Sequence, residues 1–274
     1  MRILLTNDDG WQATGILSLY QRLGRDHDVT LVAPDREKSA VSHGITLHTP
    51  LRITPLTLEG PGRAFCINGT PADCVKLGLS RLLPEPPDML ISGINPGANI
   101  GIDIYYSGTV SAAREGTMNG IPSLAVSIRV GEVMDFPNMA DYITRLAGKV
   151  WETGLPAGTL LNVNAPPVSL EALPQVKITS QSFDNISNKF ARATDPRNRE
   201  YFWYGGQADN NCQPGTDMHA LENGCISITP IQCDITNHPA MKELESLTGN
   251  LNHTRPKSKI DETKCATMDL RQSS

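Results

Sequence analysis

The feature that most constrains the fold is a regular alternation of short apolar segments and helical patterns over about the first 165 residues. Apolar runs typical of buried strands cover residues 2–6, 29–33, 89–92, 123–128 and 159–163. Between them lie helical patterns with an apolar face, such as residues 16–23, or with a helix-start signature, such as the Thr-Pro-Ala-Asp at 70–73. This alternation predicts an α/β fold with a doubly wound, mostly parallel, Rossmann-like sheet.

The pattern changes beyond residue 175, where extended segments at 176–183 and 224–235 flank a long polar stretch. We therefore expect a C-terminal β-hairpin oligomerisation region rather than another buried α/β unit. The predicted organisation is an α/β catalytic core over residues 1–175, a hairpin extension of the same domain over 176–245, and a weakly ordered polar tail over 246–274.

Charge and apolar content exclude several classes of protein. The chain has 24 Lys and Arg against 29 Asp and Glu, a net charge of −5, so it lacks the basic surface that binds polymeric nucleic acid or an anionic membrane. No apolar run approaches the roughly 20 residues of a membrane helix, and the start of the chain does not resemble a signal peptide. The six cysteines form no C-x-x-C pair. We expect reduced thiols and a cytoplasmic protein.

Three polar clusters occur where predicted strands end, at residues 7–10, 34–44 and 93–109. In doubly wound sheets, ligands bind beyond the carboxyl ends of the strands. The edge of the sheet that carries these clusters is therefore the predicted functional site.

The adjacent aspartates Asp8 and Asp9 are the strongest chemical signal in the first cluster. If their carboxylates converge, their repulsion is about 4 kcal/mol at a separation near 4 Å and an effective dielectric near 20. No Lys or Arg follows in sequence before Arg22, so a hard divalent cation would offset this repulsion. The alternative is a solvated turn that caps the next helix.

The other two clusters have weaker signals. On its residues alone, the second is typical of an exposed loop. The third places small residues with free amides before a helix that begins near Thr109, an arrangement that suits either an anion or an ordinary helix cap. It contains neither G-K-[ST] nor G-x-G-x-x-G, so a Walker A loop and a dinucleotide fingerprint are excluded.

Several longer motifs follow one another in order over roughly residues 1–130. They are Asn7-Asp8-Asp9-Gly10, Ala33-Pro34-Asp35-Arg36 with Ser39, Gly69-Thr70-Pro71-Ala72-Asp73-Cys74, Ser92-Gly93-Ile94-Asn95, Tyr106-Ser107-Gly108-Thr109-Val110, Ala112-Ala113-Arg114-Glu115-Gly116 and Gly120-Ile121-Pro122. Together these motifs resemble the SurE family (survival protein E). A weaker match continues through Thr216-Asp217, Ala220 and Gly224 to Asp234. The chain departs from the common family pattern at Trp11, Gln12 and Thr14, and at Pro96.

The resemblance implies a metal-dependent phosphatase of the 5′-nucleotidase type that hydrolyses nucleoside 5′- and 3′-monophosphates, and in some members short polyphosphate. It also implies a homodimer or homotetramer. The implied metal ligands are Asp8, Asp9, Ser39 and Asn95. The implied phosphate contacts are Ser107, Gly108 and Thr109, to which we add Asn99.

All four implied ligands offer oxygen, which suits one Mg²⁺ or Mn²⁺ per subunit. We expect direct attack by a metal-activated water, with Asp8, Asp9 and Asn95 as the catalytic residues. Two alternatives stay open: a non-enzymatic sensor of nucleotide or phosphate, and a phosphatase for a non-nucleotide ester. Further candidates are His43, His48 and His219 as acid or base groups, and Tyr105 and Tyr106 as residues that either stack on a base or simply pack.

Overall fold

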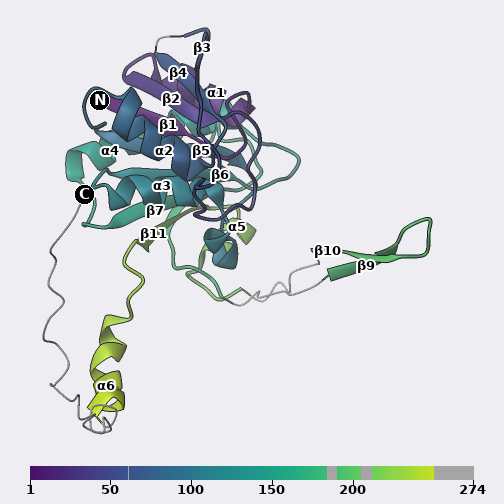
Figure 1. Ribbon diagram of the computed structural model, residues 1–274. Coiled ribbons are helices and arrows are strands. Elements are labelled where there is room, and N and C mark those ends of the chain that lie inside the picture. Colours follow the sequence, from purple (N-terminus) through teal and green to yellow (C-terminus); the bar gives the residue numbers. More distant parts are fainter. Residues whose placement is uncertain (61, 184–189, 205–211, 250–274) are drawn as a thin grey trace, which may run out of the picture. The chain divides into compact units, whose positions relative to one another are not determined.

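A computed structural model of the protein describes residues 1–60, 62–183, 190–204 and 212–249. Its centre is a nine-stranded sheet in the order β3-β4-β2-β1-β5-β6-β7-β11-β8 (Figure 1). The strands are β1 (Arg2–Thr6), β2 (Asp28–Pro34), β3 (Ile53–Leu56), β4 (Arg63–Ile67), β5 (Met89–Pro96), β6 (Ser123–Ile128), β7 (Thr159–Ala165), β8 (Val176–Ile178) and β11 (Ile226–Gln232).

Most neighbouring strands of this sheet are parallel. The strands β4, β2, β1, β5, β6 and β7 all run in the same direction, whereas β3 and β11 are antiparallel to β4 and β7. From β1, the chain adds strands on one side through β2 and β4, then returns to add β5, β6 and β7 on the other. The α/β fold with a mostly parallel sheet is thus confirmed, and its strand order reverses beside β1.

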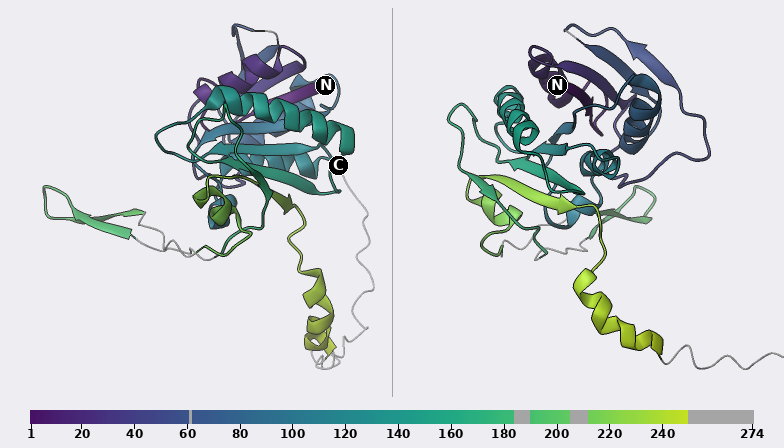
Figure 2. Two further views of the ribbon diagram at one scale, coloured as in Figure 1. Left: turned by 180° about the vertical axis from the view of Figure 1, so that it is seen from behind. Right: turned by 90° about the vertical axis from the view of Figure 1, so that its left-hand side faces the viewer.

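Helices cover both faces of the sheet (Figure 2). The helices α1 (Thr14–Leu23) and α4 (Phe136–Thr153) pack together on one face, and α2 (Pro71–Leu77) and α3 (Gly108–Met118) on the other. Successive side chains of β1 enter both layers: Ile3 and Leu5 belong to the core with α1 and α4, whereas Leu4 belongs to the core with α2 and α3. A strand buried on both faces needs such a continuous apolar run.

The predicted start of α2 at residues 70–73 is confirmed. Thr70 caps this helix by accepting a hydrogen bond from the Asp73 backbone N–H, and the Asp73 carboxylate accepts from the Thr70 N–H in return. Within residues 45–58 only the short strand β3 forms, and it contains Pro55. Strand β4 was not predicted.

The C-terminal strands confirm two of the expected extended segments, because β8 and β11 lie within 176–183 and 224–235 and join the large sheet. A separate antiparallel pair, β9 (Phe190–Thr194) and β10 (Glu200–Tyr204), forms a hairpin. Helix α5 (Asp217–Glu222) precedes β11. The divisions predicted at residues 175 and 245 stay predictions.

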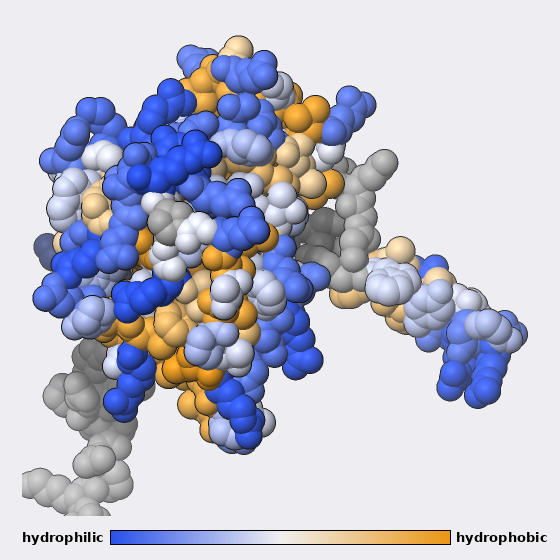
Figure 3. Space-filling model, turned by 90° about the horizontal axis from the view of Figure 1, so that it is seen from above, coloured by the Kyte–Doolittle hydropathy of each residue, from blue (hydrophilic) through white to orange (hydrophobic). Residues whose placement is uncertain are grey.

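The residues Met1–Cys233 form one compact unit. The second unit begins at Asp234 and contains α6 (His238–Gly249), which includes the first residues of the predicted polar tail. Residues 250–274 of that tail lie outside the described residues. The face shown in Figure 3 is mostly hydrophilic, with hydrophobic areas between. In the described part of the chain, no helix has the length and apolar character needed to span a membrane.

Candidate functional site

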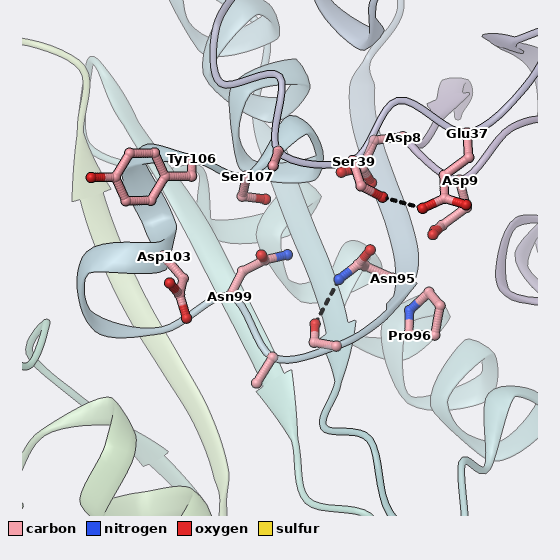
Figure 4. A pocket seen from close by; sticks show the side chains of 13 residues that line it. Asp8, Asp9, Glu37, Ser39, Asn95, Pro96, Asn99, Asp103, Tyr106 and Ser107 are labelled. Carbon is pink, nitrogen blue, oxygen red and sulfur yellow. Dashed lines mark hydrogen bonds between the residues drawn. The ribbon is translucent and has the colours of Figure 1, made fainter. Parts of the chain in front are cut away.

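A pocket of about 400 Å³ lies where β1, β2 and β5 end, beside the position at which the strand order reverses (Figure 4). It collects residues from all three polar clusters of the sequence. Six of the eight predicted site residues line it, namely Asp8, Asp9, Ser39, Asn95, Asn99 and Ser107. The other two, Gly108 and Thr109, are buried behind Asp8.

Asp8 is fixed from two directions. Its backbone carbonyl accepts a hydrogen bond of 2.7 Å from the Lys38 N–H, which ties the second cluster to the first. Its carboxylate accepts a hydrogen bond from the Thr109 hydroxyl, and the backbone N–H groups of Gly108 and Thr109 act to lower its pKa. The start of α3, which the sequence assigned to phosphate, therefore also contacts a carboxylate of the protein itself.

The turn after β1 brings the second aspartate into the same pocket. Gly10 has a φ of +95°, a conformation that side chains strongly disfavour, and its carbonyl accepts a hydrogen bond of 2.9 Å from the Asn7 amide. Lining the pocket together, Asp8 and Asp9 form the convergent pair that the sequence analysis considered.

Burial makes this pair electrostatically costly. Desolvation raises the pKa of Asp8, although its hydrogen bonds oppose the shift. Desolvation, with the neighbouring charges of Asp8 and Glu37, raises the pKa of Asp9 to about 7. The side-chain oxygens Asp9 Oδ2 and Asn7 Oδ1 are buried without a hydrogen-bond partner among the described residues. Of these two residues only Asp9 lines the pocket, so the end of β1 presents there a negative charge and one unpaired oxygen that a cation would satisfy.

Asn95 presents an oxygen to the same region. The β5–β6 register shifts between Ser92 and Asn95, so the chain bulges just before this residue. The Asn95 amide nitrogen donates a hydrogen bond of 2.6 Å to the Gly97 carbonyl, and the amide oxygen points toward the acidic side chains (Figure 4). This orientation leaves Asn95 Oδ1 available as a neutral ligand.

Glu37 is a pocket residue that the sequence analysis missed. Its carboxylate oxygen Oε1 accepts a hydrogen bond of 2.6 Å from the Ser39 hydroxyl, which orients the predicted ligand Ser39 (Figure 4). Only one position separates the two residues in the sequence, and this closeness was the available signal. It was not decisive, because the acidic Asp35 is also near Ser39 and does not line the pocket.

The donor set fits a hard divalent cation. The candidate ligands are carboxylate, amide and hydroxyl oxygens, which Mg²⁺ and Mn²⁺ prefer to the sulfur and nitrogen ligands typical of zinc. No three His, Cys, Asp or Glu side chains within the described residues are arranged to hold a metal ion. The predicted set includes only two such side chains, Asp8 and Asp9, and its other members are neutral.

Ser107 caps α3, and its hydroxyl oxygen accepts a hydrogen bond of 3.0 Å from the Val110 N–H. Its hydroxyl hydrogen is therefore still available for a ligand in the pocket. The positive end of the α3 dipole favours an anion there. This combination supports the predicted anion contact at Ser107 more directly than at Gly108 or Thr109.

A network of asparagines fixes Asn99. Its backbone N–H donates to Asn164 Oδ1 at 2.8 Å, its amide nitrogen donates to Ser127 Oγ at 2.9 Å, and its carbonyl accepts from Asn162 Nδ2 at 2.7 Å. The partners belong to β6 and β7 and are fully buried. Asn99 is thereby held in place at the pocket wall.

The candidate histidines lie elsewhere, since none of the described histidines lines this pocket. His43 Nε2 lies 2.9 Å from Glu115 Oε2, and Lys76 Nζ lies 2.9 Å from Glu115 Oε1. Burial alone would raise the pKa of Glu115, but the hydrogen bonds and charges of Lys76 and His43 outweigh it and lower the pKa. His219 lies in α5 and contacts Asn223, the residue that follows this helix.

The fold and the site together define a doubly wound α/β protein with an acidic, oxygen-lined pocket at the switch point of its sheet. The family model for survival protein SurE matches residues 3–188. The chain therefore belongs to the SurE family, as its motifs indicated.

Individual relatives extend this similarity over most of the chain. The chain is 50% identical over 246 residues to a protein of Moorella thermoacetica named 5′-nucleotidase SurE, covering 89% of this chain and 95% of the relative. A protein of Geobacter sulfurreducens with the same name is 44% identical over 265 residues, covering 94% and 97%. The crystal structure of SurE protein from Aquifex aeolicus aligns with a TM-score of 0.80 at 37% identity, covering 90% of this chain and all of that one.

Proposed function

We propose that this protein is a metal-dependent phosphatase that hydrolyses nucleoside 5′- and 3′-monophosphates to nucleoside and phosphate. The observation that carries the proposal is that Asp8 and Asp9, with the unpaired buried oxygen Asp9 Oδ2, line one pocket with Ser107, whose hydroxyl caps α3. One end of the pocket thus suits a cation and the adjacent wall suits an anion. The names of the relatives, 5′-nucleotidase SurE, support the same reaction.

The residues that would hold one Mg²⁺ or Mn²⁺ per subunit are Asp8, Asp9, Ser39 and Asn95. When bound, the cation supplies Lewis-acid polarisation of the phosphoryl group and a more acidic water. The chain contributes the placement of these ligands. The hydrogen bond from the Thr109 hydroxyl fixes the Asp8 carboxylate, the Gly97 carbonyl fixes the Asn95 amide, and Glu37 orients the Ser39 hydroxyl.

Ser107 and Asn99, which both line the pocket, bind the phosphate group. The Ser107 hydroxyl donates to a phosphate oxygen, and the second hydrogen of the Asn99 amide, which does not bind Ser127, donates to another. Because the asparagine network and the helix cap already hold both groups, little reorganisation accompanies binding. The phosphate contacts at Gly108 and Thr109 stay part of the proposal, and the Thr109 hydroxyl also positions Asp8.

The remaining parts of the proposal rest on the sequence. They are activity on short polyphosphate, assembly as a homodimer or homotetramer, and a cytoplasmic location. The alternatives of a nucleotide sensor and of a phosphatase for a non-nucleotide ester predict different outcomes in the experiment that follows.

The test measures phosphate release from 5′-AMP and 3′-AMP in the presence of Mn²⁺, Mg²⁺ or EDTA. Wild type is compared with Asp8→Asn and with Asp141→Asn, a control that removes an exposed carboxylate on α4. We expect release that requires metal, is lost in Asp8→Asn and is retained in Asp141→Asn. Release from sugar phosphates alone favours the non-nucleotide ester. No release from several nucleotides or from p-nitrophenyl phosphate by folded protein refutes the phosphatase and favours a sensor.

A further inference from the structure

The pocket extends well beyond its acidic end. Asp8, Asp9 and Glu37 lie on one side of it, Asn99 and Ser107 lie in the middle, and Tyr106 and Asp103 lie on the opposite side (Figure 4). Its volume of about 400 Å³ is in the range of pockets that hold small organic ligands. The proposed cation and phosphate contacts involve only the first side and the middle, so the side with Tyr106 and Asp103 is left without a role.

Tyr106 presents an aromatic ring at this side while its backbone is fixed. The residue is 54% exposed and lines the pocket. Its N–H donates a hydrogen bond of 3.0 Å to the Asp103 carbonyl, and its own carbonyl accepts one of 2.9 Å from the Ser42 N–H. An exposed aromatic ring on a fixed backbone is a suitable platform for a flat ring, because stacking needs no hydrogen-bond pattern.

The neighbouring Tyr105 provides an internal comparison. It is 48% exposed, close to the value for Tyr106, and it ends the short helix η2 (Gly101–Tyr105). Unlike Tyr106, it does not line the pocket. Two adjacent tyrosines of similar exposure thus differ in whether they face the candidate site.

Asp103 supplies a polar group on the same side. Its residue is exposed, and partial desolvation raises the pKa of its carboxyl group. Among the described residues, no hydrogen bond or ion pair engages this side chain. A carboxylate accepts hydrogen bonds without donating, so it suits the hydroxyl groups of a sugar and disfavours a phosphate. Its charge therefore favours one orientation of a substrate that carries phosphate at one end and hydroxyls beyond it.

We infer that Tyr106 and Asp103 form a nucleoside subsite, in which the Tyr106 ring stacks on the base and the Asp103 carboxylate accepts hydrogen bonds from the ribose hydroxyls. This inference rests on the proposed function, because it takes the phosphate to lie at Ser107 and Asn99. The subsite selects nucleotides from other phosphate esters, whereas the acidic end and Ser107 act on any phosphate monoester that reaches them.

Three substrates separate the two contacts. 5′-AMP offers both base and ribose, ribose 5-phosphate offers the ribose without a base, and p-nitrophenyl phosphate offers an aromatic ring without ribose. With Mn²⁺, Tyr106→Leu should raise KM about tenfold for 5′-AMP and for p-nitrophenyl phosphate. The same variant should raise KM for ribose 5-phosphate by at most about twofold, because this substrate has no ring to stack. Asp103→Asn should raise KM about fivefold for 5′-AMP and ribose 5-phosphate, with a smaller effect on p-nitrophenyl phosphate.

Tyr105→Leu is the matched control and should leave KM for all three substrates within twofold of wild type. Equal effects of Tyr105→Leu and Tyr106→Leu, or an equal rise for all three substrates in Tyr106→Leu, would overturn the subsite. Circular dichroism and the free energy of unfolding show whether a variant has lost its fold. If the Asp103 or Tyr106 variant does not fold, Asp103→Glu and Tyr106→Met replace it, and the same pattern of shifts is expected.

A binding measurement keeps the inference separate from the proposed reaction. Adenosine carries the base and the ribose but no phosphate, so calorimetry with adenosine reports on the subsite without turnover. We expect wild type and Tyr105→Leu to bind adenosine alike and Tyr106→Leu to bind it about tenfold more weakly. If wild type hydrolyses no phosphate ester but shows this binding pattern, the phosphatase fails and the subsite stands. Hydrolysis without the binding pattern supports the phosphatase and refutes the subsite.

Discussion

Replacing Gly108 by alanine tests whether the start of α3 determines the position of Asp8. A Cβ atom at this residue would lie 2.7 Å from Asp8 Cβ and 2.8 Å from Asp8 Oδ2. Ordinary contact between carbon atoms begins at about 3.5 Å, so the new methyl group is about 0.8 Å too close. Asp8 Cβ cannot rotate away because it is attached directly to the backbone, which the Lys38 N–H holds.

The magnitude follows from this shortfall. Overpacking of this kind costs about 1–3 kcal/mol in the free energy of unfolding. A displacement of a reacting group by about 1 Å lowers the rate about 100-fold. We therefore expect Gly108→Ala to fold with modestly lower stability, to bind Mn²⁺ more weakly and to hydrolyse 5′-AMP with kcat/KM reduced about 100-fold.

Gly148→Ala is the matched control. This glycine lies inside α4, and a Cβ atom there would have nothing within 4 Å. The substitution should raise the free energy of unfolding by about 0.5–1 kcal/mol and leave turnover unchanged. The assays are urea denaturation with Mn²⁺ and with EDTA, calorimetry with Mn²⁺, and phosphate release. A Gly108→Ala protein that binds Mn²⁺ and turns over as wild type does would refute the positioning role.

Four further outcomes follow from the charged groups. In EDTA, the pKa of Asp9, raised from 3.8 to about 7, makes the free energy of unfolding fall as the pH rises between these values, by at most about 1.4 kcal/mol per unit, because only the native state still holds the proton. In urea denaturation, the free energy of unfolding of Asp9→Asn should therefore rise relative to that of wild type between pH 5 and pH 8. A difference that does not change with pH would contradict this. Glu115→Gln should cost about 1–3 kcal/mol in urea denaturation. Because His43 lies in the loop that carries Ser39 and contacts Glu115, His43→Asn should weaken Mn²⁺ binding in calorimetry whereas Lys76→Met should not. Equal effects of the two variants would refute the loop's role. Asp73→Ala should cost about 2–4 kcal/mol, because it leaves the hydrogen bonds of two threonines unmade; a loss below about 0.5 kcal/mol in urea denaturation would contradict this.

The parts of the fold that sequence predicted are those with local or periodic signals. The β1 strand is a continuous apolar run, and the capping box of α2 lies within four residues, Thr70 to Asp73. Strand β4 escaped prediction because its short run from Arg63 to Ile67 is stabilised by pairing with β2 and β3, which its own residues do not encode.

The site residues, too, divide into those with a local signal in the sequence and those that only the fold brings together. Asp8 and Asp9 stand out because they are adjacent and follow a strand. Glu37 did not, since side-chain direction in an irregular loop has no period to read. The partner of the Thr109 hydroxyl could not be read from neighbours in sequence either, because Asp8 is 101 residues away and only the fold brings the two together.

Pro55 in β3 bears on whether this protein aggregates through the edges of its sheet. The strand at one end of the large sheet is β3, which has four residues and lacks the N–H of Pro55, and the strand at the other end is β8, which has only three residues. Exposed edge strands are templates on which another chain can add a strand and start an aggregate. The missing N–H makes β3 a poor template, and its short length does the same for β8. Replacing Pro55 by valine would thus remove one of the protections of this sheet against edge-to-edge aggregation.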